Sequence, residues 1–276
     1  MTWDSALSPD AADRPALGSV PVALLLPAML GVAFLVLPLL GLLLQAPWTD
    51  LANRLGEPEV LAALRLSLLT ATAATCLCLL LGVPLAWLLA RVAFRGRSLL
   101  RALLTVPLVL PPVVGGIALL ATFGRNGTLG GPLADLLGLQ IPFTTAAVVL
   151  AQSFVALPFL VLSVEGALRS ADRRFDEVAA TLGAGRLWTF VRVTLPLVAP
   201  GVASGAVLAW ARALGEFGAT ITFAGSREGV TRTMPIQIYA TYNTDREAAL
   251  VLSLLLLVVS VLVLAALRER WMGSAS

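Results

Sequence analysis

The sequence of 276 residues contains no histidine and no lysine, because all 19 of its basic residues are arginine. The absence of histidine removes the commonest general base and the commonest transition-metal ligand. The absence of lysine excludes a lysine nucleophile and the P-loop lysine of nucleotide-binding sites. Only two cysteines are present, Cys76 and Cys78, and their apolar neighbours favour two small buried side chains. We therefore predict no catalytic residue and no metal site, and a chain that is not itself an enzyme.

Charged residues are also scarce: 13% of the sequence is charged, whereas 58% is hydrophobic. Soluble domains usually carry about 25% charged and about 45–50% apolar residues. A membrane-spanning helix needs about 20 consecutive, mostly apolar residues. Six such runs predict an all-α polytopic membrane protein: 21–45, 63–90, 99–123, 144–164, 197–223 and 249–267. The predicted organisation is a polar N-terminal tail over 1–20, a transmembrane domain over 21–267 and a short tail over 268–276.

Arginine is distributed unevenly between the connecting segments. It gathers, with few acids, in 91–101, 169–192 and 268–270, whereas 46–62 and 124–143 contain few arginines. Because arginine-rich short loops remain in the cytoplasm, we expect six spans with both chain ends cytoplasmic.

The third predicted span contains Pro107, Pro111 and Pro112, together with Gly115 and Gly116. Proline removes a backbone donor from a helix, and in lipid the freed carbonyls must find protein or water. The prolines therefore indicate a broken helix that faces a bundle interior or an aqueous path. Kinks tolerated only for packing are the alternative.

Residues 170–196 are too many for a simple connection between two spans. Phe175, Val178, Ala179 and Leu182 form an i, i+3, i+4, i+7 apolar stripe on a predicted helix. Ser170 or Asp172 would cap its start, and Gly183 would end it in the left-handed conformation. A second short helix is expected near 186–194, ending before Pro196. This pair of helices would either present a projection to a partner or lie on lipid headgroups.

Within this segment the sequence resembles a known motif, the EAA loop of ABC-importer permeases. The resemblance rests on Glu177, Ala179, Ala180, Gly183 and the Leu195–Pro196 pair, with Val178 in place of the usual first alanine. Four further stretches resemble molybdate importer permeases, and several of these also resemble sulfate and tungstate permeases: 110–116, 123–127, 211–220 and 231–239.

The resemblance implies the type I permease fold of ABC importers, with 170–196 as the loop that couples the permease to an ATPase. It further implies a homodimer in a bacterial inner membrane, two cytoplasmic ATP-binding subunits that hold ATP and Mg, and an external oxyanion-binding protein. No nucleic acid is expected. Glu177 would pair with an arginine of the ATPase, or within the loop with Arg173 or Arg174. A sulfate, thiosulfate or tungstate permease and a non-ABC channel remain as alternatives.

Few ionisable residues lie within the predicted spans. Arg212 and Glu216 are four residues apart in the fifth span, so they can pair on one helix face. Such residues usually face a protein interior or water. They either neutralise each other within the bundle or, with hydroxyl donors from Thr220 and Ser204, contribute to a path for the oxyanion.

Overall fold

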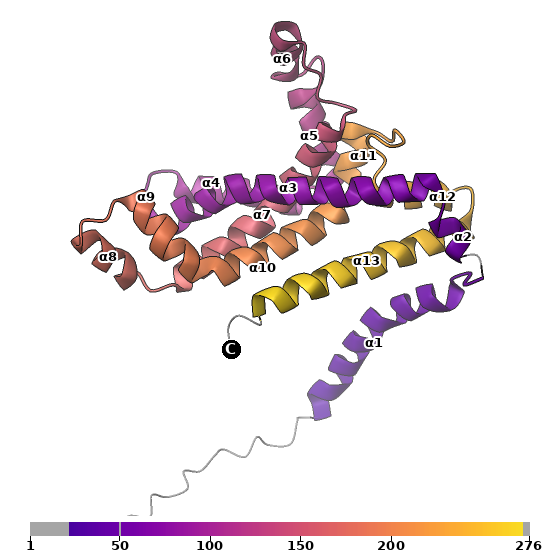
Figure 1. Ribbon diagram of the computed structural model, residues 1–276, viewed down its shortest axis with the longest axis horizontal. Helices are drawn as coiled ribbons and strands as arrows, with labels where there is room; N and C mark the ends of the chain where they lie inside the picture. Colours follow the sequence, from indigo (N-terminus) through magenta and orange to yellow (C-terminus); the bar gives the residue numbers. More distant parts are fainter. Residues whose placement is uncertain (1–21, 50, 273–276) are drawn as a thin grey trace, which may run out of the picture. The chain divides into compact units, whose positions relative to one another are not determined.

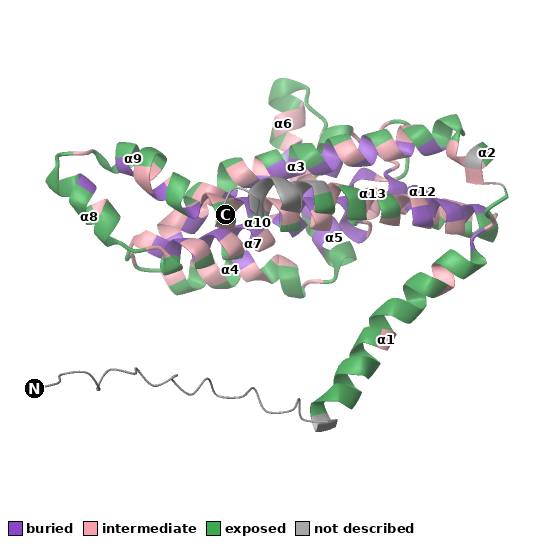
Figure 2. Cartoon of the chain, turned by 60° about the horizontal axis from the view of Figure 1, so that its bottom comes forward, coloured by how far each residue is buried: buried purple, intermediate pink, exposed green. Residues whose placement is uncertain are grey.

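The computed structural model describes residues 22–49 and 51–272, and these residues form helices and connecting loops without a strand. The chain divides into two compact units, 1–46 and 47–276. The first unit contains α1 (Val22–Gln45), an apolar helix with Pro27 and Pro38 inside it. Most of its described side chains are exposed (Figure 2). The predicted first span is thus a helix with almost the expected bounds, and the predicted tail 1–20 lies outside the described residues.

The second unit contains the other helices of the described chain (Figure 1). In chain order they are α2 (Leu51–Leu55), α3 (Pro58–Arg91), α4 (Arg97–Val109), α5 (Pro112–Phe123), α6 (Gly130–Leu137), α7 (Thr145–Ser170), α8 (Arg174–Thr181), α9 (Arg186–Thr189), the π-helix η1 (Phe190–Thr194), α10 (Leu195–Leu214), α11 (Gly218–Ala224), α12 (Met234–Tyr242) and α13 (Arg246–Met272).

Five helices among the described residues are long and apolar enough to cross a membrane: α1, α3, α7, α13, and the continuous run from α9 to α10. The pair α4 and α5 would make a sixth span, and it is bent by 118°. The bend falls at Leu110 and Pro111, both of which have extended backbone angles. A residue before proline is driven out of the helical region, so the Pro111–Pro112 pair breaks the span where the sequence predicted a break.

The fifth predicted span, 197–223, is wrong as a single helix. Helix α10 ends at Leu214, and the short helix α11 begins only at Gly218. Gly215 follows the end of α10, and the Glu216 carboxylate accepts a hydrogen bond from the backbone N–H of Ala219 at 2.9 Å. This acceptor satisfies a donor that the first turn of a new helix leaves free, so the chain restarts a helix here.

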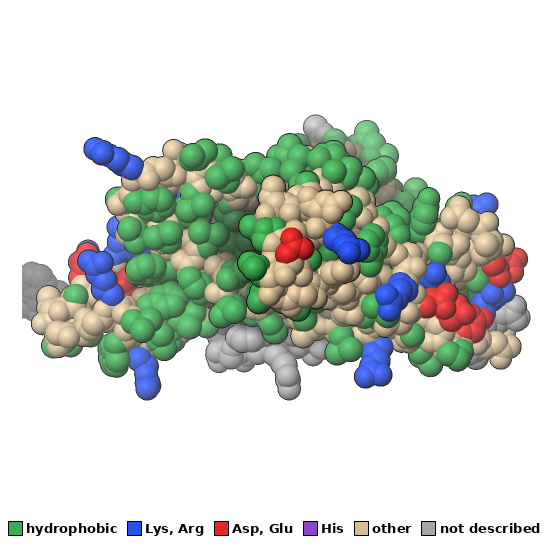
Figure 3. Space-filling view, turned by 90° about the horizontal axis from the view of Figure 1, so that it is seen from above, with side chains coloured by type: hydrophobic (Ala, Val, Ile, Leu, Met, Phe, Trp, Pro, Cys, Tyr) green, Lys and Arg blue, Asp and Glu red, His purple; other side chains and the backbone are tan. Residues whose placement is uncertain are grey.

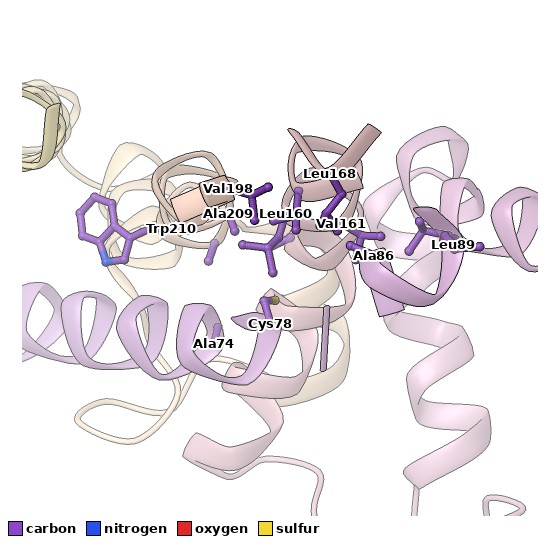
Figure 4. Packing of buried hydrophobic residues seen from close by; sticks show 14 of the residues in the cluster. Ala74, Cys78, Ala86, Leu89, Leu160, Val161, Leu168, Val198, Ala209 and Trp210 are labelled. Atoms are coloured by element: carbon purple, nitrogen blue, oxygen red, sulfur yellow. The ribbon is translucent and has the colours of Figure 1, made fainter. Parts of the chain in front are cut away.

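The core of the second unit lies around α7, which packs between α3 and α10 (Figures 1 and 4). Small residues let the backbones approach closely, as is usual between membrane helices. A Cβ placed on Gly201 of α10 would clash with the Cβ of Ala167, which cannot move aside, whereas one on Gly82 of α3 would meet the movable end of the Leu160 side chain at 2.7 Å. The crossing of α7 and α10 therefore requires glycine at position 201.

The two cysteines do not share one environment, contrary to the prediction. Cys78 is buried in this core, but Cys76 is exposed. Residues two apart on a helix point in very different directions, which explains why only one of them can face α7.

The outer faces of the long helices are apolar. Leu69, Leu80, Val261 and Leu262 are examples of large hydrophobic side chains that are more than half exposed. On the face shown in Figure 3, hydrophobic side chains cover much of the surface, and the charged ones gather toward the two sides of the view apart from an acidic and a basic side chain near its middle. An exposed apolar surface of this extent is expected where helices meet lipid or other helices.

Candidate functional site

Helix α8 begins and ends as its sequence predicted. The N-cap position of α8 is occupied by Arg173, but the Asp172 carboxylate accepts a hydrogen bond at 2.9 Å from the backbone N–H of Arg174, the first residue of the helix. The alternative cap, Ser170, is instead the last residue of α7 and donates to the carbonyl of Gly166.

The end of α8 is closed by two backbone hydrogen bonds. Gly183 has a φ of +82° and donates to the carbonyl of Ala180 at 3.0 Å. Ala184 donates to the carbonyl of Ala179 at 3.0 Å. These two bonds with a left-handed residue form a Schellman motif, so Gly183 fixes where α8 stops and how the chain leaves it.

The second helix of segment 170–196 differs from the prediction, since it does not end before Pro196. Four residues of α-helix are followed by the five-residue π-helix η1, which passes directly into α10 at Leu195. A proline ring within a helix clashes with the carbonyl four residues earlier. The wider π turn just before Pro196 relieves this crowding, so the helix continues into the next span. π-helical turns are frequent at functional sites.

A small network joins α8 to the helices on either side of it. The Thr194 hydroxyl donates to the Asp176 carboxylate at 2.7 Å, which ties α8 to the end of η1. Arg91, the last residue of α3, lies 3.6 Å from the other Asp176 oxygen and donates to the carbonyl of Ala171 at 3.4 Å. Arg173 donates to the carbonyl of Ala90 at 3.3 Å. The projection is therefore held at the ends of α3 and α10.

The apolar stripe of α8 is not buried within the chain. Ala179 is 8% exposed, whereas Phe175, Val178 and Leu182 are 55%, 58% and 83% exposed. Leu187 and Trp188 of α9 are also more than half exposed. Several of these residues line an open, mainly apolar hollow of about 1010 Å³ between the two short helices. Exposed apolar patches of this kind are typical of contact sites for proteins or membranes.

The six residues predicted for coupling lie in this projection or at the start of α10. Glu177 and Ala180 are exposed, Ala179 is buried, and Leu195 and Pro196 follow η1. The Glu177 carboxylate forms no ion pair within the described residues, so the alternative pair with Arg173 or Arg174 is wrong. Instead Arg173 reaches back to α3, and the paired acid is Asp176, which sequence reasoning missed.

The four residues predicted for the path through the membrane are only partly brought together. Arg212 and Glu216 form an ion pair, with Nη2 and Oε2 2.6 Å apart. They do not share a helix face, however, because the pair bridges the break between α10 and α11. Thr220 is fully buried in α11. Ser204 is exposed and donates to the carbonyl of Pro200 in its own helix, so it stands apart from the other three.

A further charged group was missed altogether. Glu165 of α7 is buried, and one of its oxygens accepts hydrogen bonds from Arg101 of α4 and from Arg169. The i, i+4 spacing of Glu165 and Arg169 was visible in the sequence. The contribution of Arg101 was not, since it depends on how α4 packs against α7.

A family comparison agrees with this architecture. Residues 82–273 match the model of the family described as "binding-protein-dependent transport system inner membrane component". The chain belongs to this family of transporter membrane subunits.

Individual relatives cover most of the chain. It is 55% identical to "Molybdenum transport system permease protein ModB" of Mycobacterium tuberculosis over 247 residues, which are 89% of this chain and 92% of that protein. The protein of the same name from Escherichia coli is 40% identical over 80% of this chain and 96% of its own length. These relatives are permease subunits of transport systems.

Two solved structures are similar in fold. A bacterial ABC transporter involved in the import of the acidic polysaccharide alginate matches with a TM-score of 0.71 and 18% sequence identity, over 91% of this chain and 94% of that one. The MetNI methionine ABC transporter matches with a TM-score of 0.61 and 16% sequence identity, over 78% of this chain and 95% of that one. At these identities the similarity establishes the fold, which is that of an ABC-importer permease.

Proposed function

We propose that this chain is the membrane permease of an ATP-driven importer of molybdate. The observation that carries the proposal is the near full-length identity, 55% and 40%, to two permeases named for molybdenum transport. Sulfate, thiosulfate or tungstate is the alternative cargo. A channel without an ATPase is a weaker alternative, because a channel has no use for the projecting apolar surface of α8 and α9.

In this proposal the energy comes from separate subunits. The chain has no lysine and hence no P-loop, so ATP and Mg are held by two cytoplasmic ATPase subunits. Two copies of the permease form a homodimer in the bacterial inner membrane, with both chain ends in the cytoplasm. A soluble oxyanion-binding protein delivers the cargo to the outer face. Neither nucleic acid nor a cofactor of this chain's own takes part.

Segment 170–196 is the part that would meet the ATPase. The exposed Phe175, Val178 and Leu182 supply an apolar contact surface, and Glu177, which forms an ion pair with none of the described residues, is available for an arginine of the ATPase. Ala179 is the buried residue of α8, Gly183 sets the end of this helix, and α10, the helix that would move with it, begins at Leu195 and Pro196. A short, capped helix transmits displacement better than a flexible loop.

The proposed transport path passes the break between α10 and α11. Arg212 and Glu216 neutralise each other at the break between α10 and α11, and the buried Thr220 lies just beyond them. A hydrated dianion needs water or hydrogen-bond donors along its route. Thr220 is the better placed of the two hydroxyl candidates, because Ser204 bonds to its own helix.

The test is uptake of radiolabelled molybdate by cells in which the gene has been deleted and then restored. We expect uptake to disappear and return, to be reduced by excess tungstate, and to be unaffected by excess sulfate. Loss of sulfate uptake instead would mean that the cargo is sulfate, and unchanged uptake of every oxyanion would refute the transport function. For the coupling role, Glu177→Arg should abolish uptake, whereas Asp135→Arg, an exposed acid of α6, should not.

A further inference from the structure

We infer that Arg91 and Asp176 are positioning residues, which carry a displacement of α8 into α3 and α10. This inference rests on the proposed function, because it assumes that an ATPase moves α8. It names the side chains through which that movement would reach the membrane spans, and these are not the residues of the EAA resemblance.

The first observation concerns the state of Arg91. Its side chain is 8% exposed, yet Nε and Nη1 are buried without a hydrogen-bond partner in the described part of the chain. Among the residues that the structure describes, its remaining nitrogen, Nη2, makes only the 3.4 Å bond to the carbonyl of Ala171 and the 3.6 Å ion pair with Asp176. A buried charge with so few partners is costly. A guanidinium with a purely structural role would be expected to donate more hydrogen bonds.

The second observation is the space beside Arg91. Arg91 and Asp176 line a cavity of about 390 Å³ together with Trp87, Phe190 and Thr194. Asp176 can therefore approach Arg91 more closely without displacing a packed side chain. Arg91 and Asp176 would then have two arrangements, the loose contact of this structure and a close carboxylate–guanidinium pair. A coupling element that switches between two states requires two such arrangements.

The third observation is that Asp176 holds two helices at once. One carboxylate oxygen faces Arg91 at the end of α3, and the other accepts a hydrogen bond from the Thr194 hydroxyl just before the start of α10. Thr194 is 2% exposed and ends the π-helix, a kind of turn that is frequent at functional sites. The Trp87 and Phe190 rings, 5.9 Å apart edge to face, add an apolar contact across the same junction. A shift of α8 thus acts on α3 and α10 through one side chain.

The experiment uses the full complex in proteoliposomes: the permease, its ATPase subunits and the binding protein, with molybdate as cargo. The measured quantity is molybdate transported per ATP hydrolysed, alongside recovery of the assembled complex. Asp176→Asn keeps an acceptor for Thr194 but removes the charge that faces Arg91. Arg91→Met removes the guanidinium. Asp176→Glu is the conservative variant, and Arg95→Gln, an exposed arginine of the neighbouring loop, is the matched control.

We expect the Asp176→Asn and Arg91→Met permeases to assemble normally and to support ATP hydrolysis. They should transport about tenfold less molybdate per ATP hydrolysed, which is a usual size for the coupling between two sites. Asp176→Glu should keep most of the wild-type ratio of molybdate transported to ATP hydrolysed, and Arg95→Gln should keep all of it. An unchanged ratio in both variants would overturn the inference. Loss of the assembled complex would overturn it too, because Asp176 would then serve docking or folding. Failure of the wild type to transport molybdate would instead refute the proposed function.

Discussion

Arg101 of α4 and Glu165 of α7 meet with Nη2 and Oε1 2.5 Å apart, and this contact ties the bent pair α4–α5 to the central helix. The same Glu165 oxygen also receives Arg169 at 2.8 Å. The Glu165 side chain is 5% exposed, whereas the two arginines are 38% and 48% exposed. The carboxylate is therefore the buried partner, and each arginine can take over part of the other's role.

This arrangement predicts strong non-additivity. Arg101→Gln and Arg169→Gln should each cost about 1 kcal/mol or less, since the other arginine remains and both are partly solvated. The double variant should cost about 3–5 kcal/mol, because it leaves a buried carboxylate without a partner. Thermal unfolding of the purified protein in detergent measures these differences. Costs that simply add would contradict the shared role of the two arginines.

The Arg212–Glu216 pair should respond asymmetrically to mutation. Glu216 is 1% exposed and also caps α11, whereas Arg212 is 28% exposed. Arg212→Met leaves a buried carboxylate without its partner and should destabilise the protein strongly, whereas Glu216→Gln leaves the less buried arginine without its partner and keeps an acceptor for Ala219. The double variant should be more stable than Arg212→Met alone. Unfolding curves that rank the two single variants in the opposite order would argue against this geometry.

Gly183 and Gly185 offer a matched pair for the end of α8. A Cβ would meet nothing within 4 Å at either position, but only Gly183 has a positive φ. Gly183→Ala should therefore cost about 1–2 kcal/mol in backbone strain, and Gly185→Ala should be nearly neutral. Amide hydrogen exchange in α8 provides the readout, with faster exchange expected only for Gly183→Ala. Equal exchange in both variants would mean that the left-handed turn does not hold α8.

Asp245 makes the junction of α2 with α13 sensitive to acid. The backbone N–H of Ala248 lowers the pKa of this carboxyl below its ordinary 3.8, and Arg54, 2.7 Å away, lowers it further. Because the folded pKa is lower than the unfolded one, the stabilisation is complete above about pH 4 and is lost as the pH falls through the folded pKa. Asp245→Asn should flatten the dependence of the unfolding free energy on pH between about pH 5 and about pH 2. An unchanged profile would show that the carboxylate does not contribute.

Much of the fold could be predicted from the sequence because long apolar runs and arginine-rich loops are local signals. The break at Pro111–Pro112 and the stop at Gly183 follow from backbone chemistry, and both are found. The break at Gly215 was missed, since Glu216 lies in an apolar run and its capping role depends on the restart of the helix.

The candidate site was predictable only in part, for a related reason. The spacing of Glu177 and Gly183 identified the projection, but the network of Arg91, Asp176 and Thr194 joins residues that lie far apart in the sequence, on three different helices. Periodicity within one helix carries no information about such contacts. The continuation of the helix through Pro196 was also unpredictable, because it depends on the π turn before it.

The most direct test of the central claim is transport by the purified complex in proteoliposomes. Molybdate accumulation inside the vesicles is followed with the permease, its ATPase subunits and the binding protein present, with and without ATP. The account predicts accumulation that requires ATP and all three components, and that disappears with the permease variant Glu177→Arg. Molybdate entry that proceeds equally without ATP would contradict it and leave a channel as the better description.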